Sequence, residues 1–133
     1  MSEKKTILIV EDEELMLTPL AEKLKNQGFE VVKAHDGAEG LEKALKLHPD
    51  IVILDIVMPK MDGMTVMKKI REDQKWGKDA PIVMLTNLND PDKVSEAANY
   101  NVFDFLVKTD WKLDEVVDFI KQKLEMGFIN FSA

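Results

Sequence analysis

The sequence predicts a doubly wound α/β domain with a five-stranded parallel sheet. Residues 51–59, an apolar run dominated by Val and Ile, are typical of a strand that is buried on both faces of a sheet, and four further short runs predict strands. Each run is followed by a segment with the apolar spacing of a helix, so strands and helices alternate along the chain. The length of 133 residues suits one domain with one core. We therefore expect a flavodoxin-like sheet with the strand order 2-1-3-4-5.

The first two strand–helix units occupy residues 6–47. Residues 6–10 and 30–34 predict the strands. The first helix either begins near Glu13 and kinks at Pro19, which we favour, or begins at Pro19 with Thr18 as its N-cap. The second helix is expected to have Asp36 as its N-cap and to end at residues 48–49. Its apolar residues are Ala38, Leu41, Ala44, Leu45 and Leu47.

The third unit contains residues 51–59, an apolar run with a single charge at Asp55. Burying an ionised carboxylate without a partner is costly. Asp55 is therefore expected at the open end of this strand, beside the loop that Pro59 and residues 62–63 indicate. Residues 64–74 predict the helix that follows, with Met64, Met67 and Ile70 facing inward.

The last two units end the chain. Residues 81–85 predict the fourth strand, which leads into Thr86, and a short helix should follow with Asp90 as N-cap. Residues 102–107 predict the fifth strand, which ends at Lys108. Asp110 is expected to cap the last helix, whose apolar stripe comprises Leu113, Val116, Val117, Ile120 and Leu124.

The composition argues against several classes of protein. A formal net charge of −7 argues against binding nucleic acid through a basic face. The absence of cysteine excludes disulfides, thiolate zinc sites and cysteine nucleophiles, and it fits a reducing compartment. The first apolar run is too short for a signal peptide, and no stretch is long enough to span a membrane. We expect a cytoplasmic protein whose partners are neither nucleic acid nor membrane.

Polar residues stand where the predicted strands end, and these ends meet at one edge of a parallel sheet. The residues are Glu11, Asp12, Asp55, Thr86 and Lys108. Two carboxylates about 4 Å apart repel by roughly 4 kcal/mol at an effective dielectric constant near 20, and a divalent cation removes that repulsion. Hard oxygen ligands favour Mg²⁺. Lys108 suits a phosphate, so Asp55 is equipped to attack phosphorus and form an aspartyl phosphate. Glu13 and Glu14 are expected only to complement the helix dipole.

With these residues in place, the chain resembles the receiver (phosphoacceptor) domain of two-component response regulators. The resemblance covers roughly residues 5–125 and rests on residues 7–13, 54–63, 81–86 and 105–108. It implies that Asp55 accepts a phosphoryl group from a histidine kinase or phosphotransfer protein. It implies a Mg²⁺ site made by Glu11, Asp12, Asp55 and the Val57 carbonyl. Thr86 and Lys108 would bind the phosphoryl group, and Phe105 takes the place of the family's switch aromatic.

The chain departs from the family pattern at several positions. Thr109 follows Lys108 where the family usually has proline in a cis peptide, so we expect either a trans bond with a changed loop or a strained cis bond. Asn87 replaces a small residue and is expected to narrow access to Asp55 or add a hydrogen bond. Val57 and Leu88 are apolar where the family has polar groups that orient the hydrolytic water, so self-dephosphorylation is expected to be slow.

We expect a receiver domain over residues 1–125, followed by a tail over 126–133 and no output domain. The tail can dock on the domain, join a homodimer interface or be disordered. The protein would be a signalling switch and not an enzyme, apart from its own phosphorylation and dephosphorylation. Its signal would reach a downstream protein through the surface of the fourth helix, fifth strand and last helix. Trp111 and Phe119 fall off the apolar stripe and are candidate partner contacts.

Two other functions compete with this expectation. One is an interaction module that is never phosphorylated, against which the complete acidic set and Lys108 count. The other is an aspartate-nucleophile phosphatase of the haloacid-dehalogenase type. Such an enzyme needs a second aspartate two residues after the nucleophile, and Val57 stands there.

Overall fold

The computed structural model describes residues 4–126 and contains one parallel sheet with the order β2-β1-β3-β4-β5, as predicted. The strands are β1 (Thr6–Val10), β2 (Glu30–Ala34), β3 (Ile51–Leu54), β4 (Ile82–Thr86) and β5 (Asp104–Val107). The helices are α1 (Glu14–Asn26), α2 (Gly37–Leu47), α3 (Gly63–Glu72), α4 (Pro91–Asn99) and α5 (Leu113–Met126). Two short 3₁₀ turns, η1 (Gly77–Asp79) and η2 (Lys108–Asp110), complete these elements. Of the predicted tail, residues 127–133 lie outside the described part of the chain.

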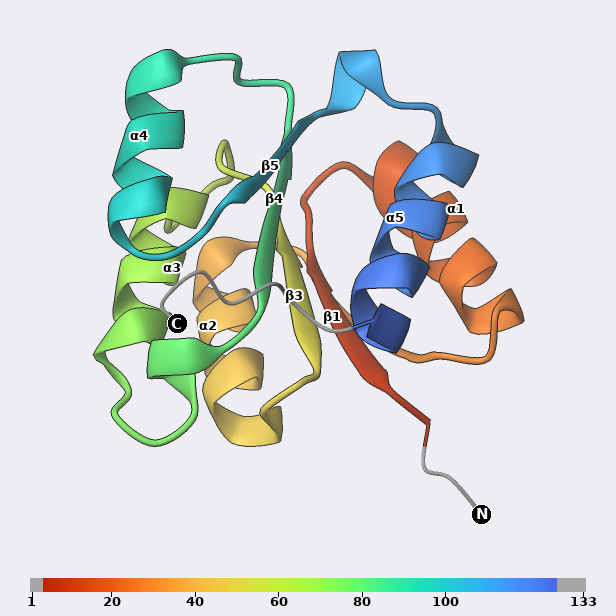
Figure 1. The fold of residues 1–133 in the computed structure, drawn as a ribbon, viewed down its shortest axis with the longest axis horizontal. Helices are drawn as coiled ribbons and strands as arrows, with labels where there is room; N and C mark the ends of the chain where they lie inside the picture. The colour runs from red at the N-terminus through yellow and green to blue at the C-terminus, as the bar shows by residue number, and fades with distance from the viewer. Residues whose placement is uncertain (1–3, 127–133) are drawn as a thin grey trace.

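The helices cover both faces of the sheet, with α1 and α5 on one side and α2, α3 and α4 on the other (Figure 1). Successive residues of a strand point to opposite faces, so a central strand needs apolar side chains throughout. In β1, Ile7 and Ile9 pack with α1 and α5, whereas Leu8 and Val10 pack on the opposite side. The unbroken apolar runs of β1, β3 and β4 therefore reflect burial on two sides, whereas the edge strands β2 and β5 are only partly buried.

The beginnings of the first, second and fourth helices agree with the predictions. Glu13 is the N-cap of α1 and Pro19 lies inside that helix, as in the favoured alternative. Asp36 caps α2 by accepting a hydrogen bond from the Glu39 backbone N–H at 2.8 Å. Asp90 caps α4 in the same way through the N–H of residue 92. The bounds of β1 and β2 are those predicted, and predicted boundaries elsewhere differ by at most two residues.

The prediction that Asp110 caps the last helix is wrong. Residues 108–110 form the turn η2, in which the Trp111 N–H donates to the Lys108 carbonyl at 3.3 Å. This turn delays the helix, so α5 begins at Leu113 and the first helical hydrogen bond runs from Val116 to the Lys112 carbonyl. Residues 4–126 contain no cis peptide bond, so the bond after Lys108 is trans, which excludes the strained cis bond of the second predicted alternative.

The buried face of α2 also differs from its predicted apolar stripe. Leu45 and Leu47 are 40% and 46% exposed, whereas Gly37, Gly40 and Ala44 are buried. A Cβ atom at Gly40 would lie 2.6 Å from Val10, so the helix needs glycine there to approach the sheet closely. Small residues therefore form the centre of this helix face, Leu41 packs against the core beside them as predicted, and Ala38, Leu45 and Leu47 of the predicted stripe are exposed.

The two aromatics that fell off the stripe of α5 pack against the core instead of standing free. Trp111 and Phe119 are partly buried, and their rings meet edge to face with centroids 5.5 Å apart. This packing explains why aromatic side chains occupy both positions.

None of the helices in residues 4–126 has the length and apolar character needed to cross a membrane.

Candidate functional site

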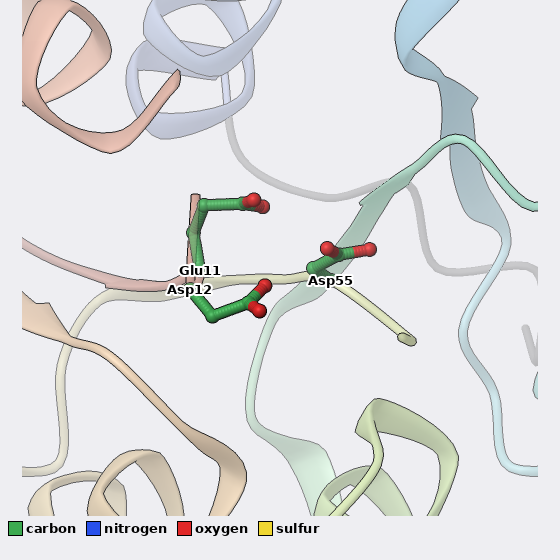
Figure 2. A group of neighbouring side chains, drawn as sticks. All are labelled: Glu11, Asp12 and Asp55. Atoms are coloured by element: carbon green, nitrogen blue, oxygen red, sulfur yellow. The ribbon is translucent and has the colours of Figure 1, made fainter. Parts of the chain in front are cut away.

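The ends of β1 and β3 bring three carboxylates together. Val10 and Leu54 are register partners, so the residues that follow them are neighbours, and the Asp55 N–H donates to the Val10 carbonyl at 3.0 Å. Figure 2 shows the side chains of Glu11, Asp12 and Asp55 around a common space beyond these strand ends. One carboxylate oxygen from each lies within 4.8 Å of the others. Sequence spacing had predicted this cluster.

Lys108 neutralises part of the negative charge of the cluster. The residue follows β5, and its buried side chain reaches the carboxylates at the ends of β1 and β3. Its Nζ atom is 2.8 Å from a Glu11 oxygen and 3.3 Å from an Asp55 oxygen. Because Glu11 and Asp55 are also buried, the ammonium group compensates charges that solvent cannot.

Burial and the neighbouring charges shift the pKa values of Glu11 and Lys108. The pKa of Glu11 is raised to about 7, chiefly by burial, which the hydrogen bond from Lys108 opposes and the charge of Asp55 reinforces. Burial by itself would lower the pKa of Lys108, but the hydrogen bond to Glu11 and the negative charges of Asp55 and Glu11 outweigh it, so this pKa is raised. Lys108 therefore stays cationic, while Glu11 is a carboxylate that takes up a proton easily.

The donor set fits a hard divalent cation. The three clustered residues offer only carboxylate oxygens, without imidazole or thiolate, and two of them, Glu11 and Asp55, share the Lys108 ammonium group. A cation with oxygen ligands would remove the remaining repulsion, and Mg²⁺ commonly binds through one or two carboxylates and water. Val57, whose carbonyl was predicted as a further ligand, follows Asp55 by two residues, and its side chain is 64% exposed.

Thr86 and its neighbours line the adjacent strand end. Thr86 is completely buried at the end of β4, and its hydroxyl accepts a hydrogen bond from the Leu88 N–H at 3.2 Å. The Asn87 side chain is exposed and makes no hydrogen bond within residues 4–126. Of the two effects predicted for Asn87, the added hydrogen bond is thus not found in this structure. Phe105 is partly buried and packs against the core under α2, α3 and α4.

Sequence reasoning missed the role of Gly63 at the start of α3. The Gly63 N–H donates to the Ile56 carbonyl at 2.8 Å, and a Cβ atom on Gly63 would lie 2.1 Å from the Asp55 carbonyl oxygen. Only glycine allows α3 to begin this close to the candidate nucleophile. From the sequence, residues 62–63 contribute a loop signal and part of the family resemblance but no predicted role at the site, although their short distance from Asp55 in the sequence pointed to one.

Glu13 was also misassigned. The sequence suggested only a helix-dipole charge, but its carboxylate lies 3.3 Å from the Lys108 Nζ. Glu14, the next residue, instead pairs with His35 at 2.9 Å. The position of Glu13 directly after two predicted ligands was the available signal.

The comparisons with known proteins agree on one family. The family model described as the response regulator receiver domain matches residues 7–121. A protein-glutamate methylesterase/protein-glutamine glutaminase of Archaeoglobus fulgidus is 38% identical over 91% of this chain, and the match covers 35% of that relative. The chain thus spans about a third of the length of the curated relatives it matches first.

Solved structures show the same similarity. Chemotaxis protein CheY4 of Vibrio cholerae superposes with a TM-score of 0.81 and 31% identity, covering 90% of this chain and 98% of that one. A CheX-CheY-BeF₃-Mg²⁺ complex from Borrelia burgdorferi contains a chain with a TM-score of 0.78 and 30% identity, covering 89% and 87% of the two chains.

Proposed function

The chain belongs to the response regulator receiver domain family, and we propose that it is a phosphorylation-dependent switch of a two-component phosphorelay with Asp55 as its phosphoacceptor. The observation that carries this proposal is the position of Asp55, which shares one buried cluster with Glu11 and Lys108 at the carboxyl edge of the sheet. A carboxylate in this setting can act as a nucleophile toward phosphorus. A cytoplasmic location follows from the same proposal.

In the proposed transfer, a carboxylate oxygen of Asp55 attacks the phosphorus of a phosphohistidine on a histidine kinase or phosphotransfer protein. The P–N bond breaks with its electron pair going to the histidine nitrogen, and an aspartyl phosphate forms. The Lys108 ammonium, 3.3 Å from Asp55, would balance the charge of the phosphoryl oxygens. The Thr86 hydroxyl, which now accepts from Leu88, can turn to donate to one of them.

The proposal includes a Mg²⁺ site made by Glu11, Asp12, Asp55 and the Val57 carbonyl. The cluster of three carboxylates supports it, as does the Mg²⁺ named with the Borrelia receiver. When bound, the ion would neutralise negative charge on the reacting oxygens. Glu11 would have to lose any proton it carries before it could serve as a ligand.

Apolar residues beside the site support docking of a protein phosphodonor. Leu15 is 94% exposed in the first turn of α1, and Met16, Pro19 and Leu113 line a shallow hollow with it. Exposed apolar residues that group together are typical of protein contact sites. Val57, on the loop after Asp55, adds a further exposed apolar residue.

The signal would leave through the face of α4, β5 and α5. Moving an equilibrium from 1:99 to 99:1 needs about 5.5 kcal/mol. Hydrogen bonds to charged groups contribute about 1.5–3 kcal/mol each, so new bonds from Thr86 and Lys108 to the phosphoryl group could supply most of this free energy. Phe105 on β5, which is paired in register with Met84 of β4, would follow the movement. On this face Phe103 and Val94 are 63% and 41% exposed.

We propose no enzymatic activity beyond phosphorylation and dephosphorylation of Asp55. The Archaeoglobus relative is named as an esterase, but the match covers 35% of its length. Hydrolysis of the aspartyl phosphate should be slow, because Val57 and Leu88 carry no polar group that could orient water. A phosphoryl lifetime of seconds, followed by mass spectrometry, would contradict this expectation.

Intact mass after incubation with acetyl phosphate tests the function. One added phosphoryl group is expected on the wild type with Mg²⁺, and none on Asp55→Ala or without Mg²⁺. Asp118→Ala, which removes an exposed aspartate of α5, serves as the matched control and should be modified like the wild type. Failure of both acetyl phosphate and histidine-kinase phosphotransfer would favour the unphosphorylated interaction module. Continuous release of phosphate from generic phosphate esters would favour the phosphatase.

A further inference from the structure

Glu13 is an unusual residue for the place it occupies. It is the N-cap of α1, and its carbonyl accepts the backbone hydrogen bonds of Met16 and Leu17. Helix N-caps favour Ser, Thr, Asp and Asn, whose short side chains accept a hydrogen bond from the first turn. The Glu13 side chain makes no such bond. Helix formation therefore does not explain a glutamate at this position.

The carboxylate of Glu13 points to Lys108 instead. Its Oε1 atom lies 3.3 Å from the Lys108 Nζ, and the Glu13 side chain is 58% exposed while the Lys108 side chain is 6% exposed. Glu11 and Asp55, the other two carboxylates on this ammonium group, are buried. Glu13 is thus the solvent-facing partner of Lys108.

This arrangement leaves Lys108 without a spare hydrogen. An ammonium group has three N–H donors, and here three carboxylates surround it. A phosphoryl group that arrives at Asp55 must compete with Glu13 for the ammonium group. The partly exposed charge of Glu13 also repels an anion that approaches from solvent.

We propose that Glu13 is a specificity-determining residue that disfavours small, free, anionic phosphodonors at Asp55. The inference rests on the proposed phosphorylation of Asp55. With acetyl phosphate, an Asp55 oxygen attacks phosphorus, the bond from phosphorus to the acetyl oxygen breaks, and acetate leaves with the electron pair. Such a donor is held by the charges of the site alone. In the hollow that Glu13 also lines, a protein donor gains apolar contacts with Leu15 and Met16 that a small anion cannot make, and these contacts offset the repulsion from Glu13.

The test compares Glu13→Gln with Glu22→Gln. Glu22 lies on the same helix, is exposed and has no side-chain partner within residues 4–126, so both variants change the net charge equally. Phosphorylation is followed by intact mass over a series of acetyl phosphate concentrations with Mg²⁺. We expect kcat/KM for acetyl phosphate to rise about tenfold in Glu13→Gln, mainly through a lower KM, because one charge close to the site is removed. Glu22→Gln should stay within about twofold of the wild type.

Two further measurements separate this role from a structural one. Glu13→Ser supplies a better N-cap and removes the charge, so its thermal stability should equal or exceed that of the wild type while kcat/KM rises as in Glu13→Gln. The gain in kcat/KM should become smaller as the salt concentration rises from about 0.02 to 0.5 M, because salt screens charges exposed to solvent. Glu13→Asp keeps the charge, so its kcat/KM for acetyl phosphate should be close to that of the wild type.

The outcomes are distinct. If the wild type is modified on Asp55 but Glu13→Gln reacts no faster, the inference is overturned and the proposed function stands. An equal gain in Glu22→Gln also overturns it, because net charge would then explain the effect. If neither the wild type nor Glu13→Gln is modified by acetyl phosphate or by phosphotransfer from histidine kinases, the proposed function fails together with the inference.

Discussion

Two clusters of carboxylates and cations lie at the carboxyl edge of the sheet. The buried cluster consists of Glu11, Asp55 and Lys108, at the ends of β1, β3 and β5. The exposed cluster consists of His35, Glu39 and Lys43, beyond the end of the edge strand β2. Each contains a glutamate within 3 Å of a lysine nitrogen. In the buried cluster the pKa of the glutamate is raised to about 7, whereas in the exposed cluster it is lowered to about 2.

The difference shows that solvent decides what an ion pair contributes. Glu39 keeps water on one side and accepts a hydrogen bond from the His35 backbone N–H, the main reason for its low pKa, with Lys43 second. Glu11 loses its water, and Lys108 offsets only part of that cost. The exposed cluster therefore stabilises the fold, while the buried cluster keeps reactive charge in place at a cost in stability.

The two clusters should differ most in how much stability the protein loses when the lysine of each is replaced. Lys108→Met leaves Glu11 and Asp55 buried without a cation, and we expect the free energy of unfolding to fall by about 3–5 kcal/mol at pH 7. Lys43→Met, the matched control, should cost below about 1 kcal/mol, because its cluster is open to water. Urea unfolding measures both values. Equal losses would show that the two clusters do not differ in the way we describe.

The next largest effect should be the change with pH in the contribution of Glu11 to the free energy of unfolding. Its pKa is raised in the folded state, so its contribution to stability is fully present below the unfolded value of 4.5 and is lost as the pH rises through about 7. At 1.36 kcal/mol per pKa unit, the stability of the wild type relative to Glu11→Gln should fall by about 3 kcal/mol between pH 4 and pH 8. Denaturant unfolding across this range provides the measurement, and a flat difference would contradict it.

Mg²⁺ should stabilise the folded protein only by binding to the carboxylates at the ends of β1 and β3. At ten times its dissociation constant, a ligand that binds only the folded state adds about 1.4 kcal/mol. We expect this gain in thermal unfolding of the wild type and its loss in Asp12→Asn. Glu39→Gln should keep the response, because its cluster lies outside the proposed site. A response to Mg²⁺ that survives in Asp12→Asn would place the ion elsewhere.

The change of stability with pH should be smallest for Glu39, and its sign should be opposite to that for Glu11. Its folded pKa is lowered, so its contribution to stability is present above 4.5 and is lost as the pH falls toward about 2. Glu39→Gln should therefore be slightly less stable than the wild type at pH 7 and equally stable near pH 2. Thermal unfolding at both pH values checks this, and a Glu39→Gln protein that is more stable at pH 7 would reverse our interpretation of the exposed cluster.

The sequence by itself determined the five alternating units, the strand order and the residues at the strand ends. These features follow from local patterns, since an apolar run marks a strand buried on both faces and parallel strands place their carboxyl ends at one edge. Asp55 could be placed where its strand meets a loop because one charge in an apolar run has few tolerable positions.

The tertiary structure alone decided the contacts that join distant parts of the chain outside the predicted cluster. The contact between Glu13 and Lys108 joins residues 95 positions apart, and the position of Glu13 beside two predicted ligands did not by itself indicate Lys108 as its partner. The close approach of α2 at Gly40 depends on Val10 of another element, and the turn η2 replaces the cap expected at Asp110. The raised pKa of Glu11 has the same origin, because burial is a property of the packed chain and desolvation outweighs the charge of Lys108 only once the strands are assembled.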